Sequence, residues 1–220
     1  MSKFMIRMIP LLALFLFVGA NQASAQSVSA YFGLGSAIDS AGTSPGCAPQ
    51  NVFDGVTGNC EPGGTMGGVF GVFGAEFMLK PHLGVNGEYA FRFAQADYLP
   101  MGGLKIRPNF YDFNAVYEPT SPDSQFVPVF EGGIGGARLP LYLNQQSCAT
   151  PSVCANFSQV FATSNHFQLH GAIGLKIYVK GDMFLKPQFD LHWVPNLNQQ
   201  YGRNFVPQFT MAIGYTFGRR

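Results

Sequence analysis

The sequence predicts an all-β protein, an eight-stranded antiparallel up-and-down transmembrane β-barrel. Three observations predict it: an export signal, an apolar composition without a second long apolar run, and repeated segments of alternating apolar and polar residues. Of the 220 residues, 47% are hydrophobic and only 11% are charged, whereas soluble domains carry roughly 25% charged residues. No run after residue 25 is long enough for a membrane-spanning helix. Strands with one lipid-facing side explain this composition, including its 22 phenylalanines and 27 glycines.

The N-terminus has the features of a secretory signal peptide. Lys3 and Arg7 precede an apolar run, and the small residues of Ala23-Ser24-Ala25 form a cleavage motif. We therefore expect residues 1–25 to be a signal peptide and residues 26–220 to be one outer-membrane β-barrel domain. An uncleaved N-terminal anchor is the alternative, although its apolar run is shorter than the about 20 residues that span a membrane as a helix.

The clearest alternation runs from residue 166 to residue 179. One side of this segment is apolar, whereas the other carries histidine, glutamine and lysine, and only a strand separates the two sets. We expect the apolar side to face lipid and polar or small residues to face the lumen. Seven further segments alternate in the same way and bring the total to eight, the smallest even number usual in such barrels. They are residues 27–37, 69–79, 85–94, 110–118, 125–139, 184–194 and 208–217.

The connections between these segments alternate between short and long. Lys180-Gly181-Asp182 is one of three short turns and predicts a tight hairpin. Outer-membrane barrels have short periplasmic turns and longer outer loops, so we expect both chain ends in the periplasm and the long loops outside. The long loops are expected at about residues 38–65, 99–106, 140–164 and 195–205.

Pro128 and Pro187 lie inside predicted strands and Pro207 directly precedes one, and proline removes a ladder hydrogen bond from a strand. We expect Pro128, Pro187 and Pro207 at strand ends or bulges.

Four cysteines occur as two close pairs, Cys47 with Cys60 and Cys148 with Cys154. An even number of cysteines in an exported chain indicates disulfides. Local pairing within each of two expected outer loops is the simplest of the three connectivities. A metal site is disfavoured, because the spacing differs from that of zinc ribbons and no histidine is close in sequence.

Several segments resemble the eight-stranded outer-membrane β-barrel family, which is OmpA-, OmpW- and OmpX-like. They are Phe73-Gly74-Ala75-Glu76-Phe77, residues 84–89, residues 128–135 and residues 209–217. The resemblance implies a monomer in the outer membrane of a Gram-negative-type bacterium. Its partners would be outer-membrane lipid and lipopolysaccharide, with periplasmic chaperones and the barrel-assembly machinery. In that family the last strand ends in an aromatic residue, which Phe217 matches, although three residues extend beyond it.

Ten ionisable residues fall on the predicted lumen face. An eight-stranded barrel is just wide enough for its side chains to fill, and buried charges need partners, so we expect a mixed-sign network that plugs the interior. A narrow polar path for ions or small solutes is the alternative. The ten residues are Glu76, Glu88, Arg92, Asp112, Glu131, His170, Lys176, Lys186, Asp190 and His192.

The histidines and serines offer weaker signals. His170 and His192 face each other across one predicted hairpin, with His166 on the same face, and histidine pairs can bind a transition metal. A hydrogen-bonding role in the lumen is the more usual one, so we expect neither a metal nor another cofactor. Ser164 and His166 lie at a strand mouth without an evident acid, and no Gly-x-Ser-x-Gly motif occurs. We therefore predict no catalytic residue.

The function expected from these features is non-enzymatic, structural or surface-interacting through the outer loops. A narrow passive pore is the alternative, and a lipid-modifying enzyme is a less favoured one. The formal charge of +1 becomes −1 when Lys3 and Arg7 are removed, which gives no electrostatic case for nucleic acid. Cations at the outer strand ends could meet lipopolysaccharide phosphates, namely Lys105, Arg107, Arg138 and Arg203.

Overall fold

The computed structural model describes residues 27–38, 43–49, 51–54, 58–64, 66–99, 104–150, 153–197 and 203–218. The predicted signal peptide, residues 1–25, lies outside these ranges and stays a prediction. None of the described residues belongs to a helix that is long and apolar enough to cross a membrane.

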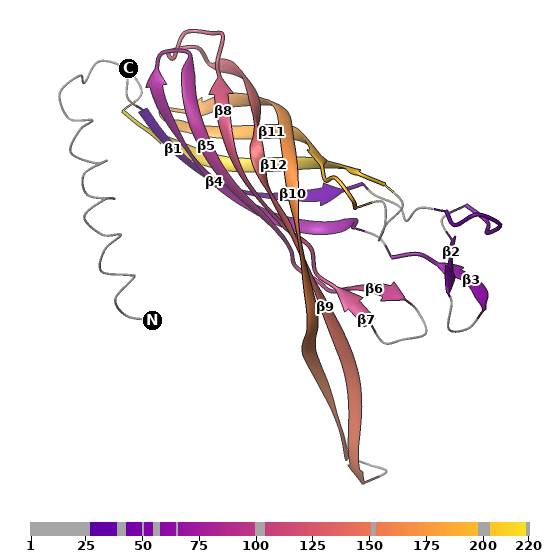
Figure 1. Cartoon of the computed structure of the whole chain (residues 1–220). Coiled ribbons are helices and arrows are strands. Elements are labelled where there is room, and N and C mark those ends of the chain that lie inside the picture. The colour runs from indigo at the N-terminus through magenta and orange to yellow at the C-terminus, as the bar shows by residue number, and fades with distance from the viewer. Residues whose placement is uncertain are drawn as a thin grey trace, which may run out of the picture.

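Eight long strands close into a barrel (Figure 1). Each strand pairs antiparallel with its neighbours in chain order, and β1 pairs with β12 to close the ring. This arrangement confirms the predicted fold class. In chain order the strands are β1 (Ser27–Ala37), β4 (Gly68–Lys80), β5 (Leu83–Arg92), β8 (Asn109–Tyr117), β9 (Phe126–Thr150), β10 (Val153–Lys180), β11 (Met183–Trp193) and β12 (Phe205–Phe217).

The short turns and the long connections lie at opposite ends of the barrel, which we name the turn end and the outer end. Residues 81–82 join β4 to β5, residues 118–125 join β8 to β9, and residues 181–182 join β10 to β11. Gly181 has a φ of 57°, a left-handed conformation that glycine adopts without strain. The tight turn predicted at this point is therefore confirmed.

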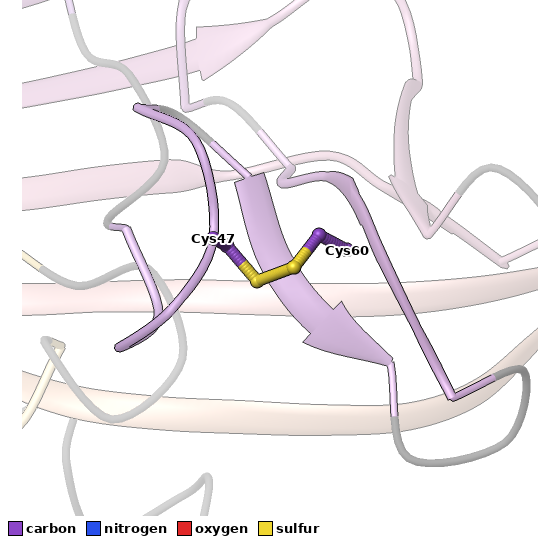
Figure 2. The surroundings of a disulfide bond; sticks show 2 residues. All are labelled: Cys47 and Cys60. Atoms are coloured by element: carbon purple, nitrogen blue, oxygen red, sulfur yellow. A yellow bond between two sulfur atoms is a disulfide. The ribbon is translucent and has the colours of Figure 1, made fainter.

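Two small hairpins lie in the long connections. β2 (Asn51–Asp54) pairs with β3 (Asn59–Pro62), and a disulfide joins Cys47, which precedes β2, to Cys60 in β3, with the two Cα atoms 5.5 Å apart (Figure 2). β6 (Ala96–Leu99) pairs with β7 (Leu104–Ile106), which in turn pairs with β9 and extends the barrel sheet outward. Local pairing is thus confirmed for the first pair of cysteines.

The connection expected as a loop at residues 140–164 is instead a paired extension of two barrel strands, so this prediction is wrong. β9 and β10 remain paired from the barrel wall to Thr150 and Val153, with register shifts at residues 153–154 and 160–162, and the resulting hairpin projects well beyond the barrel (Figure 1). Cys148 and Cys154 are opposite each other in this register, but their side chains lie outside the described part of the chain. The prediction failed because residues 158–163 are exposed on both faces of the ribbon, and a strand with water on both faces needs no apolar alternation.

The three prolines do lie in barrel strands, but Pro187 is neither at a strand end nor at a bulge, contrary to our expectation. It lies in the middle of β11, opposite Met211 on β12. On its other side the ladder with β10 has no pair between Gly174–Gln188 and Ile177–Leu185. The absence of an N–H on proline explains this local gap.

The barrel wall separates an apolar outer surface from a filled interior. Large apolar side chains are exposed on all eight barrel strands, and Phe113 and Ile173 are 70% and 61% exposed. A monomer in water rarely shows so large an apolar surface, whereas a barrel that faces lipid requires it. The residues that alternate with these exposed side chains along each strand point inward and are buried in the lumen.

Candidate functional site in the barrel lumen

The outer end of the lumen is closed by a layer of buried apolar side chains, which we name the apolar cap. Most of its residues come from the outer ends of the barrel strands, whereas Met66 and Leu197 come from the long connections. Our expectation of polar or small residues on the inner face is wrong at this end, because a barrel of eight strands is packed like a protein core. The cap consists of Ala37, Met66, Phe70, Val72, Ala90, Ile106, Phe110, Ala137, Leu139, Val194, Leu197 and Val206.

Below the cap, two lysines organise the carboxylates of the lumen. The Lys186 ammonium donates to Glu131 Oε1 at 2.6 Å and lies 4.3 Å from the centre of the Tyr31 ring. Glu131 Oε2 also accepts a hydrogen bond from Asn86 Nδ2 at 2.5 Å. Lys186 is fully buried, so its charge depends on these partners.

Nearer the turn end, the Lys176 ammonium bridges two carboxylates. It donates to Glu76 and, at 2.6 Å, to Glu118 Oε1. Both partners are buried. The lysine therefore links β10 to β4 and to the residue that follows β8. The three side chains form an ion triad across the lumen.

Between the cap and Lys186 lies a centre of acids and histidines. Asp190 Oδ1 accepts from Gln188 Nε2 at 2.5 Å and is 3.2 Å from His170 Nε2, and its Oδ2 accepts from Thr210 Oγ1 at 3.3 Å. Glu88 accepts from the Tyr31 hydroxyl at 2.7 Å. Asp112 and His192 complete the group. Every one of these ionisable side chains is buried.

The turn end of the lumen is again apolar in part. Two buried clusters lie there, one around Tyr31, Tyr178 and Phe184 and the other around Met78 and Val116. The lumen is therefore layered along the barrel axis, with an apolar layer at the outer end, a polar centre, and mixed polar and apolar side chains at the turn end.

Nine of the ten predicted lumen residues are buried inside the barrel. Arg92 lies elsewhere: it is half-buried at the outer end of β5, opposite Phe70, and its carbonyl accepts a hydrogen bond from Arg107 Nε at 2.7 Å. Sequence reasoning left out Glu118, although it continues the inward parity of Asp112 on β8. It also left out the neutral partners of the charged groups, namely Tyr31, Asn86, Asn114, Gln168, Gln188 and Thr210.

Ser164 and His166 form a second polar feature at the outer mouth. Ser164 Oγ lies 2.6 Å from His166 Nε2, and the pair is partly buried. A serine beside a histidine is the start of a nucleophilic site, but a third group must orient the histidine. Among the described residues no carboxylate is hydrogen-bonded to His166.

Comparison with known proteins identifies the fold. No protein-family model matches the chain, and no curated protein sequence matches it. The outer membrane protein OprG from Pseudomonas aeruginosa matches with a TM-score of 0.54 and 14% identity, over 88% of this chain and 96% of that chain. The fold is that of the small outer-membrane β-barrels.

Two further solved structures agree with this assignment. A major outer membrane protein from Thermus thermophilus has a TM-score of 0.51 and 10% identity, over 86% of this chain and 99% of that chain. Neisserial surface protein A has a TM-score of 0.50 and 12% identity, over 88% of this chain and 96% of that chain. At these identities the likeness concerns the fold alone, so the role of the chain must be argued from its own residues.

Proposed function

We propose that the protein is a monomeric, non-enzymatic barrel of the bacterial outer membrane that does not conduct and acts at the cell surface through its outer hairpins. The observation that carries this proposal is the apolar cap. Phe70, Phe110 and Leu139 in this layer are at most 1% exposed. An ion would have to lose its hydration shell there without gaining a polar partner, which is costly.

The outer hairpins support a surface role. Residues 140–150 of β9 alone extend for about 35 Å at the rise of a β-strand, which exceeds the about 30 Å thickness of the hydrocarbon layer. β6 and β7 widen this ribbon at its base, and the Cys47–Cys60 disulfide constrains the neighbouring hairpin. Exposed, well-defined loops on a rigid scaffold are where binding functions concentrate.

The orientation that we propose places both chain ends in the periplasm. A cysteine introduced at the exposed Ser158, in the long hairpin, should react with a membrane-impermeant maleimide on intact cells. Asp123→Cys, in a turn at the other end, should react only after the outer membrane is permeabilised. The reverse pattern would overturn the orientation.

We infer that the membrane partner is the anionic lipid of the outer leaflet. Arg107 and Tyr142 border a recess of about 330 Å³ on the outer wall, whose apolar side is formed by Phe73, Tyr89 and Phe91. Aromatic rings below a guanidinium match a lipid with acyl chains and a phosphate headgroup. Arg107→Ala should reduce the lipopolysaccharide that co-purifies with the barrel, whereas Lys180→Ala at the turn end should not.

Planar-bilayer recording tests the closed lumen directly. Purified, folded protein should show no stable unit conductance. A narrow pore is the alternative, and it would show a unit conductance whose ion selectivity changes in Lys186→Met, because that ammonium lies inside the lumen. Such a result would replace the proposal.

A further inference from the structure

Three potential metal ligands converge in the lumen beneath the apolar cap. Asp112 comes from β8, His170 from β10 and His192 from β11, and each is at most 5% exposed. One ligand atom from each residue lies within 4.8 Å of the others. His170 and His192 are direct partners in the β10–β11 register. The sequence predicts His166 on the same face as the two histidines, but in the structure the third group near them is Asp112.

Glycines on β9 allow the side chains of β8 to reach β10. A Cβ atom built on Gly135 would lie 2.6 Å from Asp112 Oδ1, and one built on Gly133 would lie 2.5 Å from Asn114 Oδ1. Both distances are far below van der Waals contact, and the carbonyl oxygens of Phe113 and Tyr111 lie closer still, so the β8 backbone together with the two side chains occupies the space that a larger residue would fill. The convergence of β8 and β10 ligands therefore depends on small residues in the strand between them.

His192 is buried without a hydrogen bond. Its exposure is 0%, and neither Nδ1 nor Nε2 has a hydrogen-bond partner among the described residues. The ring is held between Phe110 and His170, with ring centres 4.5 Å and 4.8 Å away. Asp112 Oδ2 lies 3.9 Å from Nδ1, which is beyond hydrogen-bonding distance. A buried polar group with no partner is rare and costly, and a shared metal ion would satisfy one of its two nitrogens.

His170 is oriented as a metal ligand usually is. Its Nδ1 lies 3.0 Å from Asn114 Oδ1, and an amide oxygen can only accept, so Nδ1 carries a proton. Nε2 is then free to hold either a second proton, shared with Asp190, or a metal ion. Metal-binding histidines commonly donate their other N–H to an oxygen in this way.

The charges of the lumen also favour a cation. Among the described residues, six buried carboxylates face only two lysines and two histidines. Lys176 binds Glu76 and Glu118, and Lys186 binds Glu131. Three further carboxylates remain around the histidines, namely Glu88, Asp112 and Asp190. Uncompensated charges are strongly disfavoured in such a buried site.

We propose that Asp112, His170 and His192 bind one divalent transition metal ion, of the zinc or cobalt class, inside the barrel. Two imidazole nitrogens and one carboxylate oxygen are a ligand set that suits these metals. Ligand atoms of a tetrahedral site are about 3.5 Å apart, so the widest separation closes by about 1 Å on binding. The ion links β8, β10 and β11 and balances the excess of carboxylates.

The test uses the mature barrel refolded in detergent with Co²⁺ and then desalted. We expect one Co²⁺ per barrel by elemental analysis, with visible absorption bands from the bound ion. The chain has four histidines, which allows a matched pair of double variants. The double variant H170Q/H192Q should lose the ion and its absorption, whereas H82Q/H166Q should keep both, because His82 and His166 bond elsewhere.

Two further variants grade the effect. Asp112→Asn should weaken binding by about 100-fold or more, since a ligand matters at least as much as its supporting groups, and Asn114→Ala should weaken it by about 10- to 100-fold. Heat-modifiable gel migration verifies that each variant is folded. If H170Q/H192Q does not fold, His192→Phe replaces it, because its ring preserves the stack on Phe110 without offering a nitrogen.

Three outcomes would overturn the proposal. The first is a folded wild-type barrel that retains no Co²⁺, which would mean that protons balance the carboxylates. The second is unchanged binding in the variants of the inner histidines. The third is loss of binding in H82Q/H166Q, which would locate the ion outside the lumen. None of these outcomes bears on the proposed non-conducting role, which the bilayer recordings test separately.

Discussion

The same two strands, β9 and β10, run through two different environments. Within the barrel wall, lipid-facing Ile134 and Ile173 alternate with inward-facing Glu131 and Lys176. Beyond the wall the strands remain paired, but Val160 and Phe161 are both exposed, next to a bulge in the register. Backbone pairing alone is therefore enough to form a strand. The alternation of apolar and polar residues arises only in the wall, where one face of the strand meets lipid and the other meets the packed lumen. Substitutions in the wall should therefore cost far more stability than matched substitutions in the hairpin.

The largest effect is expected where a charge is buried in the wall region. Lys176→Met leaves Glu76 and Glu118 buried without their cation, so the free energy of unfolding should fall by about 3–5 kcal/mol. Lys180→Met, at the exposed turn of the same strand, should change it by less than about 0.5 kcal/mol. Urea unfolding followed by the fluorescence of the single tryptophan, Trp193, measures both. Equal stabilities would mean that Lys176 does not hold the lumen together.

An apolar truncation should give a smaller but still clear contrast. Leu139→Ala removes a fully buried side chain from the apolar cap, and a cavity of this kind costs about 3 kcal/mol. Val160→Ala, 21 residues further along and 57% exposed in the hairpin, should stay within about 0.5 kcal/mol of the wild type. The same urea titration applies, and a large effect at Val160 would show that the hairpin packs against something.

Shortening the hairpin should leave the barrel almost unchanged. Asn144 and Ser158 are partners in the register, so residues 145–157 can be replaced by an Asn-Gly turn. The free energy of unfolding should change by less than about 1 kcal/mol, since no buried side chain of the wall is lost. Heat-modifiable migration and urea unfolding measure this, and failure of the shortened chain to fold would show that the hairpin guides assembly.

The smallest effect is expected at the Ser164–His166 pair. A fluorophosphonate probe should not label the folded protein, because no carboxylate orients His166 in the described part of the chain. Labelling of the wild type that disappears in Ser164→Ala would contradict the non-enzymatic role. Mass spectrometry of lipid A from cells with and without the protein would then identify the modification.

Much of the fold could be predicted from the sequence because successive residues of a barrel strand face lipid and lumen in turn. The lipid side requires apolar residues, and the lumen side accepts polar ones. The strand from residue 166 to residue 179 was predicted from this alternation, and so were the burial of Lys176 and the tight turn at Gly181. The predictions from the sequence were wrong in the two regions where strand residues have other surroundings than lipid on one side and a polar lumen on the other. Residues 158–163 of the hairpin are exposed on both faces, and Phe70 and Phe110 face a packed apolar layer in the lumen rather than a polar one.

The sequence by itself determined the class of fold, the strand number and which residues face inward, because side-chain direction alternates strictly along a strand. Only the tertiary structure decided which inward residues meet. Asp112 and Asn114 approach His170 across β9 because glycines at positions 133 and 135 leave room for their side chains. Arg92 alternates with the lipid-facing residues as predicted, but it lies half-buried at the outer end of β5, opposite Phe70. The register around the closed ring sets these distances, and one strand's own alternation carries no information about its neighbour's register.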